Sequence, residues 1–176
     1  MTVIDYRITS KEGFDPKIGE LISMLEHTRS VTMEELCGIS REELDYVDGP
    51  GGNTIGSLLM HIAAIERIHQ ILSFDERDLT QDESDTWGKA LNLGEGANKQ
   101  YHGLEAAAYL EALQEVRSVT LASFSRFSDQ WLQEERKWGN GVSHNFHYIW
   151  YHVMEDEINH RGQIRLLRRK YRACSN

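Results

Sequence analysis

The chain contains little proline. Only two of its 176 residues are proline, Pro16 and Pro50. Because proline interrupts helices, the long proline-free tracts are open to helix formation. No apolar run approaches the length of a membrane-spanning helix, so we expect no membrane partner. Hydrophobic residues make up 40% and charged residues 27% of the chain, as in an ordinary soluble globular protein, and the length fits one domain over residues 1–176.

Cysteine is equally scarce. Cys37 and Cys174 lie far apart and match no metal-ligand spacing, and two cysteines make no disulfide framework. The first residues lack the basic and then apolar layout of a signal peptide. Together these absences predict a cytoplasmic protein.

Positive charge is also in short supply, since the formal net charge is -9 at pH 7. An acidic surface repels phosphate backbones, so we expect no nucleic-acid partner. A basic cluster near the C-terminus is the exception, and we interpret it as the solvated end of a helix, where cations complement the negative dipole. This cluster consists of Arg165, Arg168, Arg169, Lys170 and Arg172.

Apolar residues recur at helical spacing in four tracts, which we predict to be long helices. Asp15 and Pro16 give the first of them a start signal, as N-cap and first helical residue. The four tracts cover about residues 15–37, 54–73, 104–127 and 143–171. Four long helices in one short chain predict an all-α four-helix bundle, in which sites form between facing helices.

The connections between these helices differ in length. Residues 74–103 carry charges, glycines and few aliphatic side chains, so we predict a long irregular connection between the second and third long helices. A connector of that length without regular structure is uncommon, and we expect it to form a lid or a rim over a site. Residues 138–141 are predicted to form a turn.

Three polar side chains fall on the apolar seams of the predicted helices. His61 lies on the seam of the second helix, among aliphatic neighbours at spacings of three and four. Asp156 and His160 occupy the gap between Val153 and Ile164 on the fourth helix. Four residues apart, they stand one turn above the other and face the same way.

Two imidazoles and one carboxylate are a recurrent ligand set for Zn²⁺ and for non-haem Fe²⁺. Each residue also has a structural alternative. His61 could be a core histidine bonded to a carbonyl, Asp156 a buried acceptor, and His160 a partner of Asp156 alone. Three polar intrusions into one seam favour the metal site, because burying them without a partner is costly. Three protein ligands would leave coordination positions open, as in catalytic sites.

Other polar residues of these helices are secondary candidates. His152 faces about 80° away from His160 around the helix, so we place it as pocket lining or as a fourth ligand of lower rank. His69 is expected at the edge of the bundle. Glu66 and Glu157 are candidate bases, although a solvated helix face is the favoured interpretation for both.

The residues after His160 are unusual within a helix. Glycine at position 162 costs about 1 kcal/mol relative to alanine, which suggests close packing of another helix or room for a bound molecule. Arg161 could bind a substrate carboxylate, but an intrahelical pair with Glu157 is the favoured account. Gln163 could orient a ligand through a hydrogen bond.

The run from His160 to Gln163, with a carboxylate four residues before it and a histidine on an earlier helix, resembles the DinB/YfiT-like metal-binding superfamily. The stretch from Asn53 to Glu66 is similar to the second helix of that family. The family's three ligands map onto His61, Asp156 and His160. Many members carry His at the position of Asp156, and relatives of mycothiol-dependent maleylpyruvate isomerase carry Glu there, so Asp departs from both patterns.

The resemblance implies a four-helix bundle, often a homodimer, that holds a divalent metal such as Zn²⁺ or Ni²⁺. It also implies a thiol-dependent enzyme, in which a low-molecular-weight thiol such as mycothiol or bacillithiol takes part in S-transfer or isomerisation. The partners would then be a small thiol and an electrophile. A metal with an open position could deprotonate such a thiol near neutral pH.

Three functional hypotheses follow. The first is a metal-dependent enzyme that activates a small thiol for transfer to an electrophile in detoxification or stress. The second is a metal-dependent hydrolase in which Glu66 or Glu157 is the base. The third is a non-enzymatic metal-binding stress protein, which a coordination sphere closed by His152 would favour.

Overall fold

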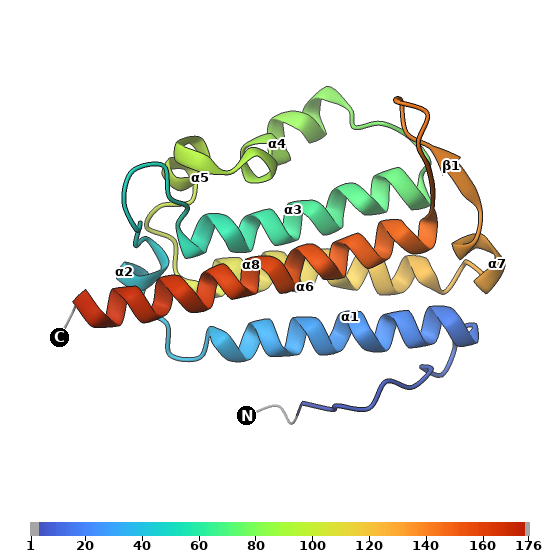
Figure 1. Ribbon diagram of the computed structural model, residues 1–176, viewed down its shortest axis with the longest axis horizontal. Helices are drawn as coiled ribbons and strands as arrows, with labels where there is room; N and C mark the ends of the chain where they lie inside the picture. The colour runs from blue at the N-terminus through green and yellow to red at the C-terminus, as the bar shows by residue number, and fades with distance from the viewer. Residues whose placement is uncertain (1–3, 175–176) are drawn as a thin grey trace.

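Four long helices form the body of the protein in the computed structural model, which describes residues 4–174 (Figure 1). They are α1 (Pro16–Glu35), α3 (Ile55–Phe74), α6 (Ala106–Phe124) and α8 (Phe146–Cys174). Asp15 and Pro16 start α1 as predicted, and the Thr54 side chain caps α3 by accepting from the amide of Ser57. The predicted all-α four-helix bundle is confirmed.

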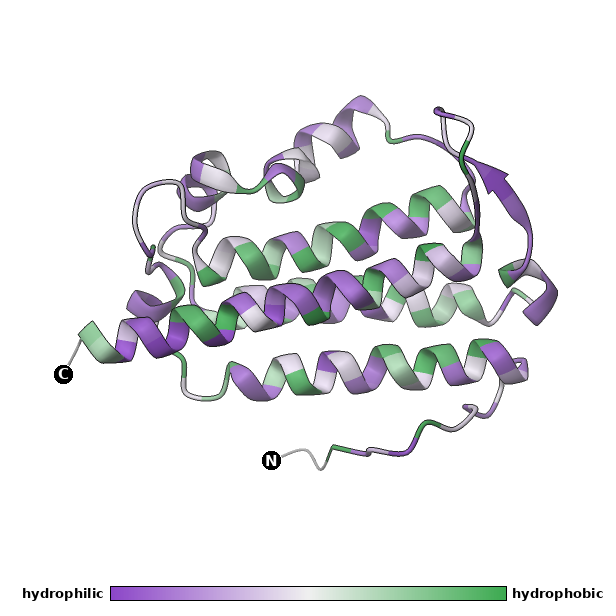
Figure 2. Cartoon of the chain, in the orientation of Figure 1, coloured by the Kyte–Doolittle hydropathy of each residue, from purple (hydrophilic) through white to green (hydrophobic). Residues whose placement is uncertain are grey.

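Helix α3 occupies a central place, because it packs against both α6 and α8, while α1 packs against α8. In Figure 1, α3 and α8 lie side by side and run in opposite directions. Green and purple residues alternate along each long helix in Figure 2, as expected of helices with one buried face. At the end of the bundle where α8 begins, Trp150 is fully buried and its indole nitrogen donates to Ser73 on α3.

The predicted irregular connection over residues 74–103 is wrong, because the segment contains two helices. They are α4 (Gln81–Asn92) and α5 (Gly94–Gln100). Thr80 and Glu83 form a reciprocal capping box that starts α4. Ala90 of α4 and Ala97 of α5 are fully buried in the same core cluster as residues of α3. The segment lies along one side of α3 in Figure 1, and both of its helices contact α3.

A small antiparallel hairpin precedes α8. It pairs β1 (Glu135–Lys137) with β2 (Ser143–Asn145), so the last predicted helix begins three residues later than expected. The predicted turn at 138–141 is confirmed, since the Gly141 amide bonds to the Trp138 carbonyl and Gly141 has a φ of 83°. Two short helices, α2 (Arg41–Leu44) and α7 (Asp129–Leu132), complete the described elements.

The basic cluster at the C-terminal end of α8 is only partly solvated. Arg168 is buried and donates to Glu43 of α2 at 2.7 Å, so the interpretation as a solvated helix end is wrong for this residue. Arg165 pairs with Glu35 of α1, and Lys170 pairs with Asp48. These contacts fasten the end of α8 to the preceding elements. None of the helices within residues 4–174 is both long enough and apolar enough to cross a membrane.

Candidate metal centre

His61 of α3 meets Asp156 and His160 of α8 where the two helices pack. The Nε2 atom of His61 lies 3.6 Å from Oδ1 of Asp156, and Nε2 of His160 lies 3.4 Å from the same oxygen. The imidazole rings are 4.6 Å apart and nearly perpendicular. The predicted convergence of these three side chains is therefore present, with one donor atom from each within 4.8 Å of the others.

Helix α4 fixes the orientation of His61. The Nδ1 atom of His61 bonds to the carbonyl of Ala90 at 2.9 Å, which places the ring proton on Nδ1. The lone pair on Nε2 then faces Asp156 and His160. A metal-ligating histidine commonly has this second hydrogen bond, because it sets both tautomer and ring direction. The segment predicted to be irregular thus contributes directly to the site.

Two polar atoms of the triad have no hydrogen-bond partner. Oδ2 of Asp156 and Nδ1 of His160 are both buried and unpaired. Buried polar atoms without a partner are costly. A bound ion would account for Oδ2 of Asp156, whereas Nδ1 of His160 points away from an ion held by Nε2 of the same ring. The donor separations also suit a metal, because donor atoms around a tetrahedral Zn²⁺ at about 2.0 Å are about 3.3 Å apart. These side chains fit a divalent ion.

Burial and the charges of the neighbouring side chains shift the pKa values of His61 and Asp156 in opposite directions. Burial alone would lower the pKa of His61, but the hydrogen bond and charge of Asp156 raise that pKa above its ordinary value. Burial would raise the pKa of Asp156, yet the two imidazoles hold the pKa of that carboxyl well below its usual range. The carboxylate is therefore ionised at neutral pH and available to a cation.

His152 is not part of the triad. Its side chain is 38% exposed, and Nδ1 lies 3.3 Å from the carboxylate of Glu155. Its ring instead faces His69, at 5.4 Å between centroids. His69, expected at the bundle edge, is buried with 8% of its surface exposed.

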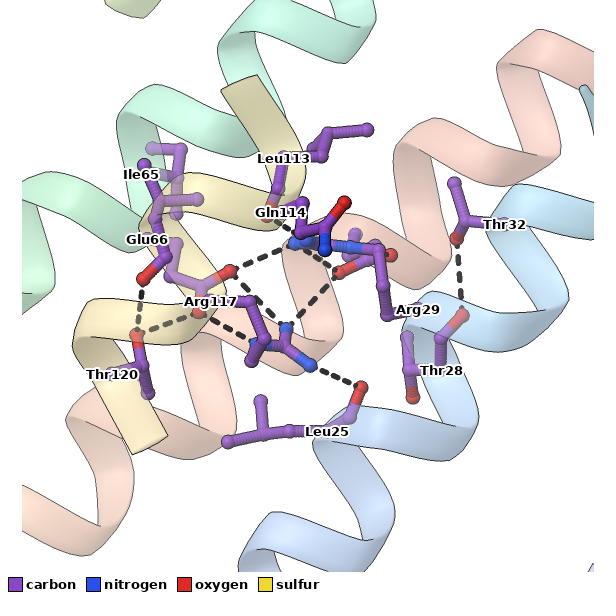
Figure 3. Close-up of polar contacts among 12 residues, drawn as sticks. Leu25, Thr28, Arg29, Thr32, Ile65, Glu66, Leu113, Gln114, Arg117 and Thr120 are labelled. Atoms are coloured by element: carbon purple, nitrogen blue, oxygen red, sulfur yellow. Dashed lines mark hydrogen bonds and ion pairs between the residues drawn. The ribbon is translucent and has the colours of Figure 1, made fainter. Parts of the chain in front are cut away.

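The interpretation of Glu66 and Glu157 as solvated is wrong. Both are buried in a network with Arg29 of α1 and Arg117 of α6 (Figure 3). Arg29 donates to Glu157 at 2.9 Å and to Glu66 at 2.8 Å, and Arg117 donates to Glu66 at 2.7 Å. Each long helix contributes one charge, so the four charges balance inside the bundle.

Hydrogen bonds to neutral groups complete this network. Arg29 also donates to the carbonyl of Leu113, Arg117 to the carbonyl of Leu25, and Thr120 to Glu66. Neither arginine is among the residues predicted from the sequence to have a functional role. A signal was present, because each stands four residues after a buried leucine, Leu25 and Leu113, and therefore on the buried stripe of its helix.

The residues after His160 also differ from expectation. Arg161 donates to the carbonyl of Thr28 at 3.0 Å, so the predicted pair with Glu157 is not the main contact of its guanidinium. Apart from the adjoining backbone of α8, no atom of residues 4–174 lies within 4 Å of where a Cβ of Gly162 would stand, so none of the other described helices packs there. Gln163 is exposed. The outer face of α8 at Gly162 is open.

The sequence model of the family described as mycothiol-S-transferase matches residues 20–173. The chain belongs to the mycothiol S-transferase family. This family is part of the DinB/YfiT-like superfamily, so the resemblance inferred from His61, Asp156 and His160 is confirmed at the level of the family.

Solved structures agree on the fold. A conserved protein from Enterococcus faecalis superposes with a TM-score of 0.65 at 16% identity, covering 85% of this chain and 93% of that one. A protein from Streptococcus pneumoniae superposes with a TM-score of 0.64 at 20% identity, covering 89% and 90%. No curated protein sequence matches the chain significantly. At these identities the two structures support the fold of the chain and nothing further.

Proposed function

We propose that the protein transfers a low-molecular-weight thiol to an electrophile, with a divalent metal ion, Zn²⁺ or Ni²⁺, held by His61, Asp156 and His160. The observation that carries the proposal is the convergence of three donor atoms, with Oδ2 of Asp156 buried and unpaired. Membership of the mycothiol S-transferase family supports the thiol as cosubstrate.

The chemistry needs a thiolate, and the bound metal would supply it by lowering the pKa of the thiol. The ionised Asp156 would reduce the net charge of the site, while Ala90 keeps His61 in the required tautomer. In the transfer the thiol loses its proton to solvent, the sulfur forms a bond to the electrophilic atom, and the leaving group departs with its electron pair. Cys37 and Cys174 are both exposed and away from the triad, which supports a nucleophile supplied by the cosubstrate.

The two competing hypotheses have less support. A hydrolase would need a free base, and both candidates, Glu66 and Glu157, are engaged in ion pairs with Arg29 and Arg117. A closed structural site would need His152 as a fourth ligand, whereas its ring lies beside His69 and its Nδ1 faces Glu155.

The proposal extends to partners and location. The net charge of -9 supports small-molecule partners and no nucleic acid. The family resemblance supports a homodimer, and the scarcity of cysteine supports a cytoplasmic setting. Light scattering of the purified protein tests the dimer, since a monomeric mass would contradict it.

Fluorescence of monochlorobimane tests the transfer, because conjugation to a thiol makes this electrophile fluorescent. We expect conjugation of mycothiol or bacillithiol above the uncatalysed rate only with metal-loaded protein, and at least tenfold less with His160→Ala. A Cys37→Ser/Cys174→Ser variant should retain the rate. Equal rates for the wild type and His160→Ala would contradict the proposal. Hydrolysis of ester substrates without any thiol would instead support the hydrolase.

A further inference from the structure

A cavity lies between the β1–β2 hairpin and the first turn of α8, at the end of the bundle where α8 begins (Figure 1). Its volume is about 500 Å³, within the range of small-molecule sites. Tyr148 of this cavity stands eight residues before Asp156, which is about 12 Å along α8 at 1.5 Å per residue. The cavity is therefore separate from the triad. Among the residues that line it are Glu135, Trp138, His144, Asn145 and Tyr148.

Two aromatic rings of the cavity are open to solvent. Trp138 is 36% exposed and Tyr148 is 46% exposed. Trp138 makes its ring contact with His144, and Tyr148 makes its ring contacts on α8, so the two rings line one cavity without touching each other. A ligand that enters between them meets the negative faces of aromatic rings, which attract cations.

Both rings are held in place before any ligand binds. The indole of Trp138 stacks on the imidazole of His144, with 3.7 Å between centroids and 10° between planes. The amide of Trp138 also donates to the carbonyl of Val142 at 2.9 Å. Asn145 accepts from the amide of Tyr148 at 2.9 Å, which caps the first turn of α8. A preformed site of this kind loses little entropy when a ligand binds.

The carboxylate of Glu135 supplies the charge of the cavity. Glu135 lies opposite Asn145 in the hairpin, so both side chains are on the same face. Only the backbone carbonyl of Glu135 accepts a hydrogen bond, and no described residue pairs with its carboxylate. Burial lowers the pKa of His144, so this ring adds no positive charge at neutral pH. Lys137, two residues after Glu135, does not line the cavity.

These features favour one class of ligand. An anion would be repelled by the unpaired carboxylate, and a neutral apolar molecule would cover that carboxylate without pairing it. A cation that carries alkyl groups pairs with the carboxylate and packs against both rings.

We propose that the hairpin cavity binds a small organic cation, a methylated ammonium compound, between Trp138 and Tyr148, with Glu135 balancing its charge. This site is independent of the proposed thiol transfer and needs no metal ion.

NMR titration with choline tests the site. Choline carries a trimethylammonium group, and dimethylbutanol has the same shape with a carbon atom in place of the charged nitrogen. We expect choline to shift the indole N–H resonance of Trp138 saturably, and dimethylbutanol to bind about three- to tenfold more weakly. The resonance of Trp138 is identified by its absence from the spectrum of Trp138→Leu.

Matched variants make the result specific. Glu135→Gln should weaken choline binding about two- to fivefold and leave dimethylbutanol binding unchanged, because only the charged probe interacts with the carboxylate. Glu95→Gln neutralises an exposed glutamate of α5 and should change neither affinity. In Trp138→Leu, observed through the amide resonance of Tyr148, the preference for choline should decrease, because leucine keeps the apolar surface and lacks the ring.

Equal affinity of the wild type for choline and dimethylbutanol would overturn the inference, since the cavity would then select no charge. Choline binding that Glu135→Gln and Glu95→Gln affect equally would also overturn it, and so would a Trp138 resonance that millimolar choline does not shift. If Trp138→Leu disturbs the hairpin, Glu135→Gln still decides, because the carboxylate of Glu135 makes no hydrogen bond whose loss would affect folding.

Discussion

The carboxylate of Glu157 lies 2.9 Å from the guanidinium of Arg29 in the interior of the bundle. Glu157 directly follows Asp156 in the chain, so one turn of α8 carries a triad residue on one face and a buried ion pair on another. Glu66 of α3 joins the same guanidinium and lies five residues after His61. Arg29 of α1 therefore forms ion pairs with both of the helices that supply the triad.

Neutralising Glu157 should destabilise the fold. In Glu157→Gln the guanidinium of Arg29 loses a charged partner while staying buried, and breaking a buried ion pair on one side costs about 3–5 kcal/mol. Urea denaturation of the metal-free protein measures this loss. Glu95→Gln is a suitable control, because Glu95 pairs with Lys99 on the surface and both side chains are exposed. Equal midpoints for the two variants would show that the network contributes nothing to stability.

The pH dependence of stability should report the pairing within the triad. The pKa of Asp156 is lowered, so its contribution is present above about 3.9, the ordinary pKa of Asp, and is lost as pH falls through the lowered value. The pKa of His61 is raised, so its contribution is complete below about 6.5 and is lost as pH rises through the raised value.

In metal-free protein the stability difference between the wild type and Asp156→Asn should therefore be largest near pH 5–6 and decline towards pH 8. Urea denaturation with a chelator present measures it. In metal-loaded protein the stability difference between the wild type and Asp156→Asn should instead increase as pH rises, because the imidazoles must lose their protons to bind the ion. If this stability difference increased with pH while the chelator was present, the ion pairing of Asp156 with the imidazoles would be contradicted.

Alanine at two helical glycines should have opposite effects. Gly162 has open space around its missing side chain, so Gly162→Ala should stabilise α8 by about 0.5–1 kcal/mol. A Cβ at Gly56 would collide with the hydroxyl of Tyr109, so Gly56→Ala should destabilise by about 1–3 kcal/mol. Thermal unfolding measures both effects as shifts of the midpoint temperature relative to the wild type. Destabilisation by Gly162→Ala would instead indicate that a partner packs closely on this face of α8.

The periodicity of the sequence was sufficient to predict the bundle and the triad. Four stripes of apolar residues gave the long helices, and the polar interruptions at His61, Asp156 and His160 identified the facing seam. This succeeded because helical geometry fixes the face of each residue from its position alone.

Features that depend on partners distant in sequence were missed. Helix α4 is rich in charge and buries little besides Ala90, so its apolar signal is weak, although its capping box at Thr80 and Glu83 could have been recognised. The buried charges of Glu66 and Glu157 resemble a solvated face until Arg29 and Arg117 are placed beside them. A local pattern cannot report which distant residue compensates a buried charge.

Elemental analysis of protein purified without an affinity tag tests the account most directly. After incubation with Zn²⁺ or Ni²⁺ and removal of the excess, we expect about one divalent ion per chain, as three convergent ligands imply. His61→Ala and Asp156→Ala should each lose most of that metal while keeping their helical circular dichroism. Metal retained by both variants, or wild-type protein that binds none, would contradict the assignment of His61, Asp156 and His160.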